Sequence, residues 1–448
     1  MKNKRNRFVW LSGFMLLLVL VIAGCSGDNT GGDEDGGDNS GDSEGGVTEV
    51  TLWHMEEPPQ RVERFNQVIQ QFNEEHDDIE VKPQVQSWDD AYSQFPAAIQ
   101  AGNGPDLLFT LPDYTTLIQD LGVVQPMDEI YESLNEEHGF TESAITPYQY
   151  DDTTWALPIF GMVQALWYRA DFLEEEGLEA PQTWEELTAA VQALDTEDRN
   201  GIALPASKSL ATDQVLYTFM ITAGAKDIID GDNNINFNQP ATVKAYEMYA
   251  ELLEYSPNDS NTYTWGEPQA QFNSGNAAMA IEKGQYLAPF EEESGRPAED
   301  LGVVPMPVAE GGEEGSIYYS NGIMMLTEDE QKQEAIKTFF DYLYTPENYA
   351  EFINAEPGLF LPVTESAMES DAYWSNEVVS QYEEEVRTLM DIAENGALFG
   401  FTDGVSSEVG QISGPNILAD TLGQMISNGM SAEEAVEWGQ QQMEAAIE

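Results

Sequence analysis

A tract over residues 26–46 separates the part of this chain that can fold from the part that cannot. It contains eight Gly and seven Asp or Glu, and it has no aromatic or aliphatic residue. Such a segment buries too little apolar surface to offset the entropy of ordering it, so we expect a flexible, self-repelling tether. From residue 47 onward, Trp, Tyr, Phe and Leu recur to the C-terminus. About 400 residues should therefore fold. A single hydrophobic core rarely supports a chain of that length, so we predict two lobes.

The segment before this tract has the pattern of a bacterial lipoprotein signal. Four basic residues among the first seven precede an apolar run over residues 14–22, which is too short for a confident membrane span. Small residues then lead to Cys25, the single cysteine, whose thiol is the nucleophile that lipid attachment needs. We predict a signal peptide over 1–24, a lipidated Cys25 and a tether over 25–46, which would hold the body at the extracellular face of the cell membrane. An ordinary signal peptide with an incidental cysteine is the alternative.

Charge restricts the partners of the chain. It has 82 Asp and Glu against 17 Lys and Arg. Four of those basic residues lie in the leader. The mature chain therefore has 13 Lys and Arg against 82 Asp and Glu, a net charge of −69. A surface this anionic repels nucleic acid and anionic lipid, and we predict no nucleic-acid binding. The acids are spread through the body, which indicates a halophilic protein in which salt screens the self-repulsion. With Cys25 lipidated, no thiol remains for a disulfide, a metal site or catalysis.

Hydrophobic periodicity predicts strands that alternate with amphipathic helices, the pattern of an α/β fold with covered sheet faces. The residues that follow the third strand, 111–114, should emerge at its carboxyl end, where open α/β sheets bind ligands. The expected order is strand 50–53, helix 60–75, strand 79–85, helix 89–101 and strand 106–110.

Several segments occur in a characteristic order along the chain. The most specific is PQTWEEL at 181–187, where Thr183 and Glu186 also have the spacing of a capping box, and Gly177 before it has the place of a helix C-cap. The other segments are TLWH at 51–54, AIQAGNGPD at 98–106, LP at 157–158, ALWY at 165–168 and FNSGNAAMAIEKG at 272–284. Together they resemble an extracellular solute-binding protein of an ABC importer, in the maltose-binding-like carbohydrate group, over nearly all of residues 47–448.

The resemblance implies a two-lobe periplasmic-binding-protein-like fold with a hinge and a ligand cleft between the lobes. Lobe I would comprise residues 47–157 and about 316–364. Lobe II would comprise residues 158–315 and about 365–448. The chain would cross between the lobes near residues 157, 316 and 364.

The resemblance also implies that aromatic rings cover the apolar face of a sugar while acids and amides bind its hydroxyls. Asp113 and Glu57 stand where the family places hydroxyl-binding acids. Tyr286 matches the position of a ring that stacks on the sugar. Trp265 lies in a short polar loop before the helix that the segment at 272–284 is expected to begin. The remaining expected ligand-binding residues are Trp53, His54, Trp88, Tyr114, Phe160 and Phe360, whereas Trp167, Tyr168 and Trp184 are assigned to the core. Thr110, Met162 and Asn416 depart from the maltose-type pattern, which puts maltose itself in doubt but not carbohydrate.

We therefore predict a monomeric binding protein without catalysis, cofactor or metal, which delivers a neutral sugar or oligosaccharide to the transmembrane subunits of an ABC permease. One alternative is a secreted glycoside hydrolase, which needs two carboxylates about 5–10 Å apart. Another is a binding protein for a polyamine or a glycerol phosphate ester. The missing basic cluster disfavours a phosphate ligand, whereas the excess of acids is compatible with a cationic ligand. A calcium loop at 230–241 lacks the required glycine and closing glutamate, and the three His are too scattered for zinc.

Overall fold

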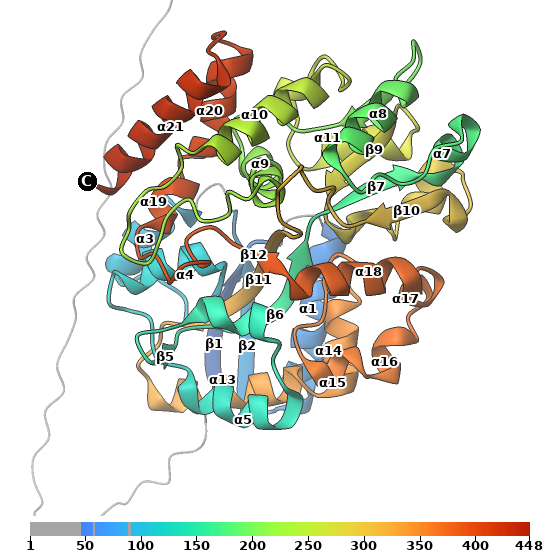
Figure 1. Cartoon of the computed structure of the whole chain (residues 1–448). Coiled ribbons are helices and arrows are strands. Elements are labelled where there is room, and N and C mark those ends of the chain that lie inside the picture. Colours follow the sequence, from blue (N-terminus) through green and yellow to red (C-terminus); the bar gives the residue numbers. More distant parts are fainter. Residues whose placement is uncertain (1–45, 57–58, 88–90) are drawn as a thin grey trace, which may run out of the picture. The chain divides into compact units, whose positions relative to one another are not determined.

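The computed structural model describes residues 46–56, 59–87 and 91–448, and the predicted signal peptide, Cys25 and nearly all of the tether lie outside them. The strands form two separate sheets plus a small hairpin, β4 (Gln149–Tyr150) with β5 (Thr153–Thr154) (Figure 1). Among the described residues, no helix combines the length and the apolar character required to cross a bilayer.

The first sheet has the order β12-β11-β3-β1-β2, with β6 paired to β11. Strand β1 lies parallel to β2 and to β3, whereas β11 runs antiparallel to β3 and to β6. The carboxyl ends of β1 and β3 therefore lie at one edge of the sheet. The strands are β1 (Thr48–His54), β2 (Ile79–Val85), β3 (Leu107–Thr110), β6 (Leu157–Val163), β11 (Ser316–Met325) and β12 (Gly396–Ala397).

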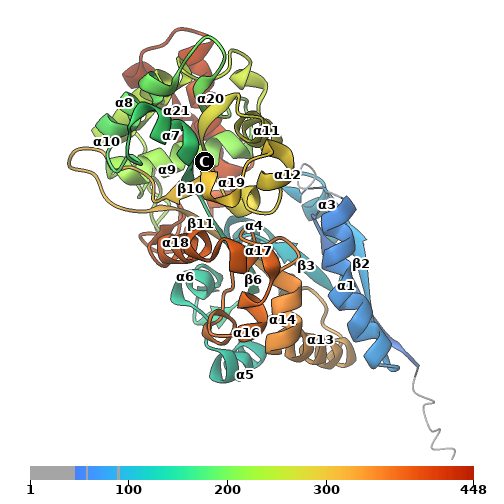
Figure 2. The same cartoon turned by 90° about the vertical axis from the view of Figure 1, so that its right-hand side faces the viewer.

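Helices α1, α13 and α14 contact one another beside this sheet, as Figure 2 shows. The periodic apolar residues of α1, including Phe65, Val68 and Phe72, are buried, as the helical stripe predicts. The helices that pack with this sheet or with one another are α1 (Pro59–Glu75), α3 (Phe95–Gln100), α4 (Pro112–Gln119), α5 (Asp128–His138), α6 (Glu142–Ile145), α13 (Glu330–Leu343), α14 (Pro346–Ile353), α15 (Glu365–Met368), α16 (Asp371–Trp374), α17 (Glu377–Gln381) and α18 (Glu383–Glu394).

The second sheet has the order β10-β7-β9-β8, in which β9 is parallel to β8 and antiparallel to β7. Its strands are β7 (Ala165–Arg169), β8 (Asn200–Ala203), β9 (Ala277–Glu282) and β10 (Leu301–Val304). The helices of this part are α7 (Ala170–Glu176), α8 (Trp184–Leu194), α9 (Leu210–Ala223), α10 (Pro240–Leu253), α11 (Gly266–Asn273), α12 (Phe290–Ser294), α19 (Val409–Ser413), α20 (Ile417–Ile426) and α21 (Ala432–Ile447).

Local signals in the sequence have the predicted structures. Thr183 caps α8, and Glu186 completes the capping box. Gly177 ends α7 with a φ of 65°, a left-handed conformation that suits glycine. Trp167 and Trp184 are buried, whereas Tyr168 is half-buried. The helix predicted over residues 89–101 is shorter, because α3 covers only Phe95–Gln100.

The chain passes between the sheets at Gln164, the residue between β6 and β7. The Gln164 side-chain oxygen accepts a hydrogen bond from Thr218 of α9 at 2.9 Å, and its backbone oxygen accepts one from Ser316 at the start of β11 at 2.7 Å. The lobe boundaries stay a prediction. The contacts favour a first boundary between the lobes at Gln164, because β6 belongs to the first sheet. They favour a last boundary after β12, because α15 and α16 pack on α5 and α14, which lie beside the first sheet.

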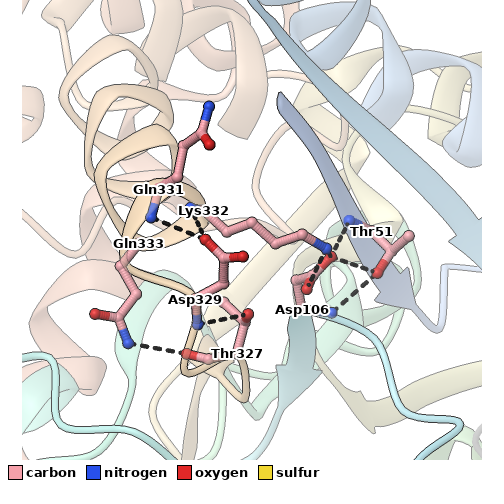
Figure 3. A network of polar contacts seen from close by, with 7 residues as sticks. All are labelled: Thr51, Asp106, Thr327, Asp329, Gln331, Lys332 and Gln333. Carbon is pink, nitrogen blue, oxygen red and sulfur yellow. Dashed lines mark hydrogen bonds and ion pairs between the residues drawn. The ribbon is translucent and has the colours of Figure 1, made fainter. Parts of the chain in front are cut away.

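A network at the amino-terminal edge of the first sheet joins β1, β3 and α13 (Figure 3). The Asp106 carboxylate accepts hydrogen bonds from the Thr51 amide at 2.8 Å and the Thr51 hydroxyl at 2.9 Å. The Lys332 ammonium lies 2.8 and 2.9 Å from its two oxygens. This edge is opposite the one where Asp113 follows β3, so we assign the network to stability.

Candidate functional site

Asp113 lies in the first turn of α4, directly beyond the carboxyl end of β3, as the sequence predicts. Only 2% of it is exposed, and one carboxylate oxygen accepts a hydrogen bond from the Tyr92 hydroxyl at 2.8 Å. The other oxygen, Oδ1, is buried and has no hydrogen-bond partner within 3.5 Å. Burial raises the pKa of Asp113, while the Ser413 and Tyr92 hydroxyls act in the opposite direction. Asp113 can therefore accept a further hydrogen bond from a ligand hydroxyl.

Residues from α9 approach the same region. Asp213 is buried and accepts hydrogen bonds from the Ala419 amide at 2.6 Å and from the Asn416 side chain at 3.2 Å. Burial raises the pKa of Asp213 to about 7. Tyr319 of β11 lies near both acids: burial raises its pKa, and the negative charges of Asp113 and Asp213 raise it further. Two buried acids and a tyrosine from different parts of the fold thus share one neighbourhood.

Further buried polar atoms on these elements also have no hydrogen-bond partner within 3.5 Å. They are Ser320 Oγ and Asn321 Nδ2 of β11 and Thr212 Oγ1 of α9. Buried polar groups in native proteins nearly always have a partner, so these atoms are available to a water molecule or to a polar ligand.

A group of charged side chains lies at the carboxyl ends of β1 and β9. Arg61 pairs with Glu56 at 3.2 Å and with Glu356 at 3.3 Å. Lys283 pairs with Glu282 at 3.2 Å. Burial lowers the pKa of Lys283, and the Arg61 charge lowers it further, whereas Glu282 opposes the shift. Both cations are thus matched by carboxylates, so neither offers an unmatched positive charge to an anion.

The predicted aromatic residues fall into several separate contacts. Tyr286 is fully buried, stacked on Trp167 with centroids 5.2 Å apart, and its hydroxyl has no hydrogen-bond partner within 3.5 Å. Phe160 and Phe360 stack on each other at 3.7 Å and are also buried. Trp265 is 37% exposed, and the Lys283 ammonium lies 4.0 Å from its ring centroid.

The other predicted residues lie near β1 or α4. Trp53 is half-buried and donates a hydrogen bond to Gln84 at 3.1 Å. His54 is buried and stacks on Phe65, and burial lowers its pKa to about 4. Tyr114 is buried and contacts Tyr92 edge-on at 5.3 Å. Glu57 and Trp88 lie outside the described residues.

Sequence reasoning missed Tyr92, Gln214, Tyr319 and Lys283. One signal was available for Tyr319, because polar residues interrupt an otherwise apolar strand in SIYYSNGIMM. Gln214 lies on the apolar, buried helix α9, and Lys283 directly follows the buried strand β9, so neither position carries a local signal for a site. Their contact with the neighbourhood of Asp113, or with Trp265 for Lys283, depends on how distant segments pack.

Two surface grooves of the described residues lie elsewhere. One of about 380 Å³ is lined by Trp184 and Met248 between α8 and α10. A second of about 410 Å³ is lined by Arg64, Glu351 and Asn354 beside α1 and α14. Neither contains a predicted ligand-binding residue. Within the described ranges, no group of three or more His, Cys, Asp or Glu side chains is placed to hold a metal ion.

The chain belongs to the bacterial extracellular solute-binding protein family, whose profile matches residues 58–350. It is a solute-binding component of an ABC transporter, and the family and fold are those of extracellular or periplasmic binding proteins, not of enzymes. The α/β, two-lobe periplasmic-binding-protein-like fold predicted from the sequence is confirmed by the solved structures that it resembles.

Relatives and solved structures agree with this assignment. YcjN of Escherichia coli (strain K12), provisionally named an ABC transporter periplasmic-binding protein, is 24% identical over 83% of this chain and 86% of its own length. The sn-glycerol-3-phosphate-binding periplasmic protein UgpB of Shigella dysenteriae serotype 1 (strain Sd197) is 24% identical over 72% of this chain and 75% of its own length. Maltose-bound T. maritima MalE3 has a TM-score of 0.76 at 16% identity, covering 89% of this chain and all (100%) of that one.

Proposed function

We propose that this protein captures a neutral sugar or oligosaccharide outside the cell and delivers it to an ABC permease. The observation that carries the proposal is the polar neighbourhood around Asp113, where a buried carboxylate oxygen has no partner and Tyr319 and Gln214 approach from β11 and α9. A sugar presents a rim of hydroxyls that can donate to such a carboxylate, and these charge-assisted hydrogen bonds are the stronger ones. Solved neighbours described as bound to maltose, ribitol or α-D-tagatose support a polyhydroxylated ligand.

We propose further that lipidation of Cys25 keeps the protein, as a monomer, at the extracellular face of the cell membrane. This proposal rests on the basic head, the short apolar run and the single cysteine of the leader. Metabolic labelling with a fatty-acid analogue should mark the intact chain and not a Cys25→Ser variant. Equal labelling of both would contradict it.

A glycerol phosphate ester is the second candidate, because UgpB relatives are named for sn-glycerol-3-phosphate. It requires cationic groups that face the phosphate. Arg61 and Lys283 are matched by Glu56, Glu356 and Glu282, and together these five groups have a net charge of −1. Burying a phosphate beside this group would add charge repulsion, so we favour the neutral sugar.

Thermal unfolding of the full chain with a ligand panel tests the choice. The panel contains maltose, ribitol, tagatose, spermidine and sn-glycerol 3-phosphate. A ligand present at 100 times its dissociation constant stabilises a protein by about 2.7 kcal/mol. We expect stabilisation by a neutral member of the panel. Stabilisation by glycerol phosphate or spermidine, without stabilisation by any neutral member of the panel, would contradict the proposal.

Two variants then locate the site by calorimetry with the ligand so identified. Asp113→Ala removes the buried acceptor, worth about 1.5–3 kcal/mol for a hydrogen bond to a charged group, so affinity should fall at least about tenfold. Tyr286→Ala should have a similar effect if its ring covers the sugar, whereas Tyr286→Phe, the matched control, keeps the ring. Unchanged affinity in both alanine variants would place the site elsewhere. Unfolding curves of each variant separate lost binding from lost folding, since Tyr286 is buried.

A further inference from the structure

Two glycines bring the parts of the fold built on the two sheets into backbone contact. Gly284 follows β9 of the second sheet after one residue. Gly358 lies after α14, in a segment whose Leu361 pairs with Gly161 of β6 in the first sheet. Both glycines are buried. The two loops therefore touch across the fold while each is held by its own sheet.

This contact leaves no room for a side chain at Gly284. A methyl group there would stand 1.9 Å from the Gly358 carbonyl oxygen and 3.0 Å from the Leu359 amide nitrogen. The atoms that it would meet belong to the backbone, so no side-chain rotation relieves the overlap. Any larger residue at Gly284 must move one loop away from the other.

Gly358 is constrained from its own side. Its φ is +78°, and a methyl group there would lie 2.3 Å from Cδ1 of Leu287. Glycine is the residue that adopts this conformation without a steric penalty. The contact thus depends on the absence of a side chain at both positions.

Members of the charged group described above lie beside the glycine contact. Lys283 precedes Gly284, and Glu356 precedes Gly358 by two residues. Arg61 of α1 pairs with Glu356, and its positive charge also lowers the pKa of Lys283, so it lies near both loops. The cations are matched by carboxylates, so the overlap of a side chain at Gly284 with backbone atoms, and not charge repulsion, should separate the loops.

We propose that Gly284 and Gly358 form the closing contact between the two lobes and set how far the lobes close. The inference rests on the proposed function only in that the closed lobes would enclose the sugar. It concerns these two residues and not the identity of the ligand.

Distances between spin labels test this contact in the full chain. The labels are placed on exposed positions by Glu292→Cys in α12 and Glu347→Cys in α14, with Cys25→Ser to remove the native thiol. The reference chain should show a short-distance population. We expect Gly284→Val to reduce this population about tenfold in favour of longer distances, and Gly284→Ala to reduce it less. Measurements are made without ligand and with maltose as the probe.

The matched control is Gly423→Ala in α20, where an added methyl group meets nothing within 4 Å. It should leave the distances unchanged. Equal distances in the reference chain and in Gly284→Val, with and without maltose, would overturn the proposal. Distances lengthened equally by Gly423→Ala would also overturn it.

A cross-linking measurement keeps the proposal testable if Gly284→Val fails to fold. Gln285→Cys and Glu356→Cys, again with Cys25→Ser, place one thiol on each loop without altering either glycine. A short bis-maleimide should join them within the chain, and no cross-link would overturn the proposal. The two proposals fail separately, because a ligand panel without stabilisation leaves these distances unaffected, and unchanged distances leave sugar binding intact.

Discussion

Removing the Asp106 carboxylate should destabilise the fold without touching the ligand site. The carboxylate accepts hydrogen bonds from the Thr51 amide, the Thr51 hydroxyl and the Lys332 ammonium, and it joins β1, β3 and α13 (Figure 3). It is 8% exposed, so these bonds are largely screened from water. Truncating one partner of a buried ion pair costs about 3–5 kcal/mol, and we expect Asp106→Ala to fall at the lower end of that range, because water reaches Lys332.

The individual contributions can be separated. Lys332→Met leaves the Asp106 carboxylate with its two hydrogen bonds from Thr51 but without its cation, so it should cost less than Asp106→Ala but more than the loss of a surface ion pair. The matched control is Asp341→Ala, which removes a surface ion pair with Lys337 on the same helix, and it should change stability by less than about 0.5 kcal/mol. Urea unfolding of the full chain, followed by fluorescence and circular dichroism, gives the free energies. A cost for Asp106→Ala no larger than for Asp341→Ala would refute the reasoning.

The pH dependence gives an independent check. Burial alone would raise the pKa of Asp106, but the Lys332 ammonium and the Thr51 hydrogen bonds together lower it below its usual 3.8. A lowered pKa in the folded state stabilises the fold above the unfolded value, and this stabilisation is lost as the pH falls through the folded value. The difference in stability between the wild type and Asp106→Ala should therefore shrink below about pH 4. A constant difference would indicate that the charge of Asp106 is not responsible.

Two more predictions concern the buried acid and the net charge. Burial raises the pKa of Asp213 to about 7, so the folded state holds a proton that the unfolded state loses, and stability should fall as the pH rises from about 4 to 7. Asp213→Asn should flatten this fall in unfolding free energy; an unchanged slope would contradict the assignment. With a net charge of −65 for the whole chain, the unfolding midpoint should rise as NaCl shortens the Debye length from about 10 Å to about 3 Å. A flat or falling midpoint would contradict the halophilic interpretation.

Much of the fold could be predicted because its signals are local. The strand over residues 79–85 and the capping box of Thr183 and Glu186 depend on periodicity and on spacings of a few residues, and both occur as predicted. The position of Asp113 beyond β3 follows from the turn after a buried strand. The leader with Cys25 is also a local pattern, and it remains a prediction.

The surroundings of these residues depended on tertiary structure. Tyr92 contacts Asp113 from 21 positions away, and Lys332 reaches Asp106 from 226 positions away. Gly284 and Gly358 look like ordinary loop glycines until the two sheets are placed beside each other. Periodicity reports which face of a segment is buried, but not which distant segment buries it. That choice is made by packing over the whole fold, where close contact between distant segments decides which side chains meet.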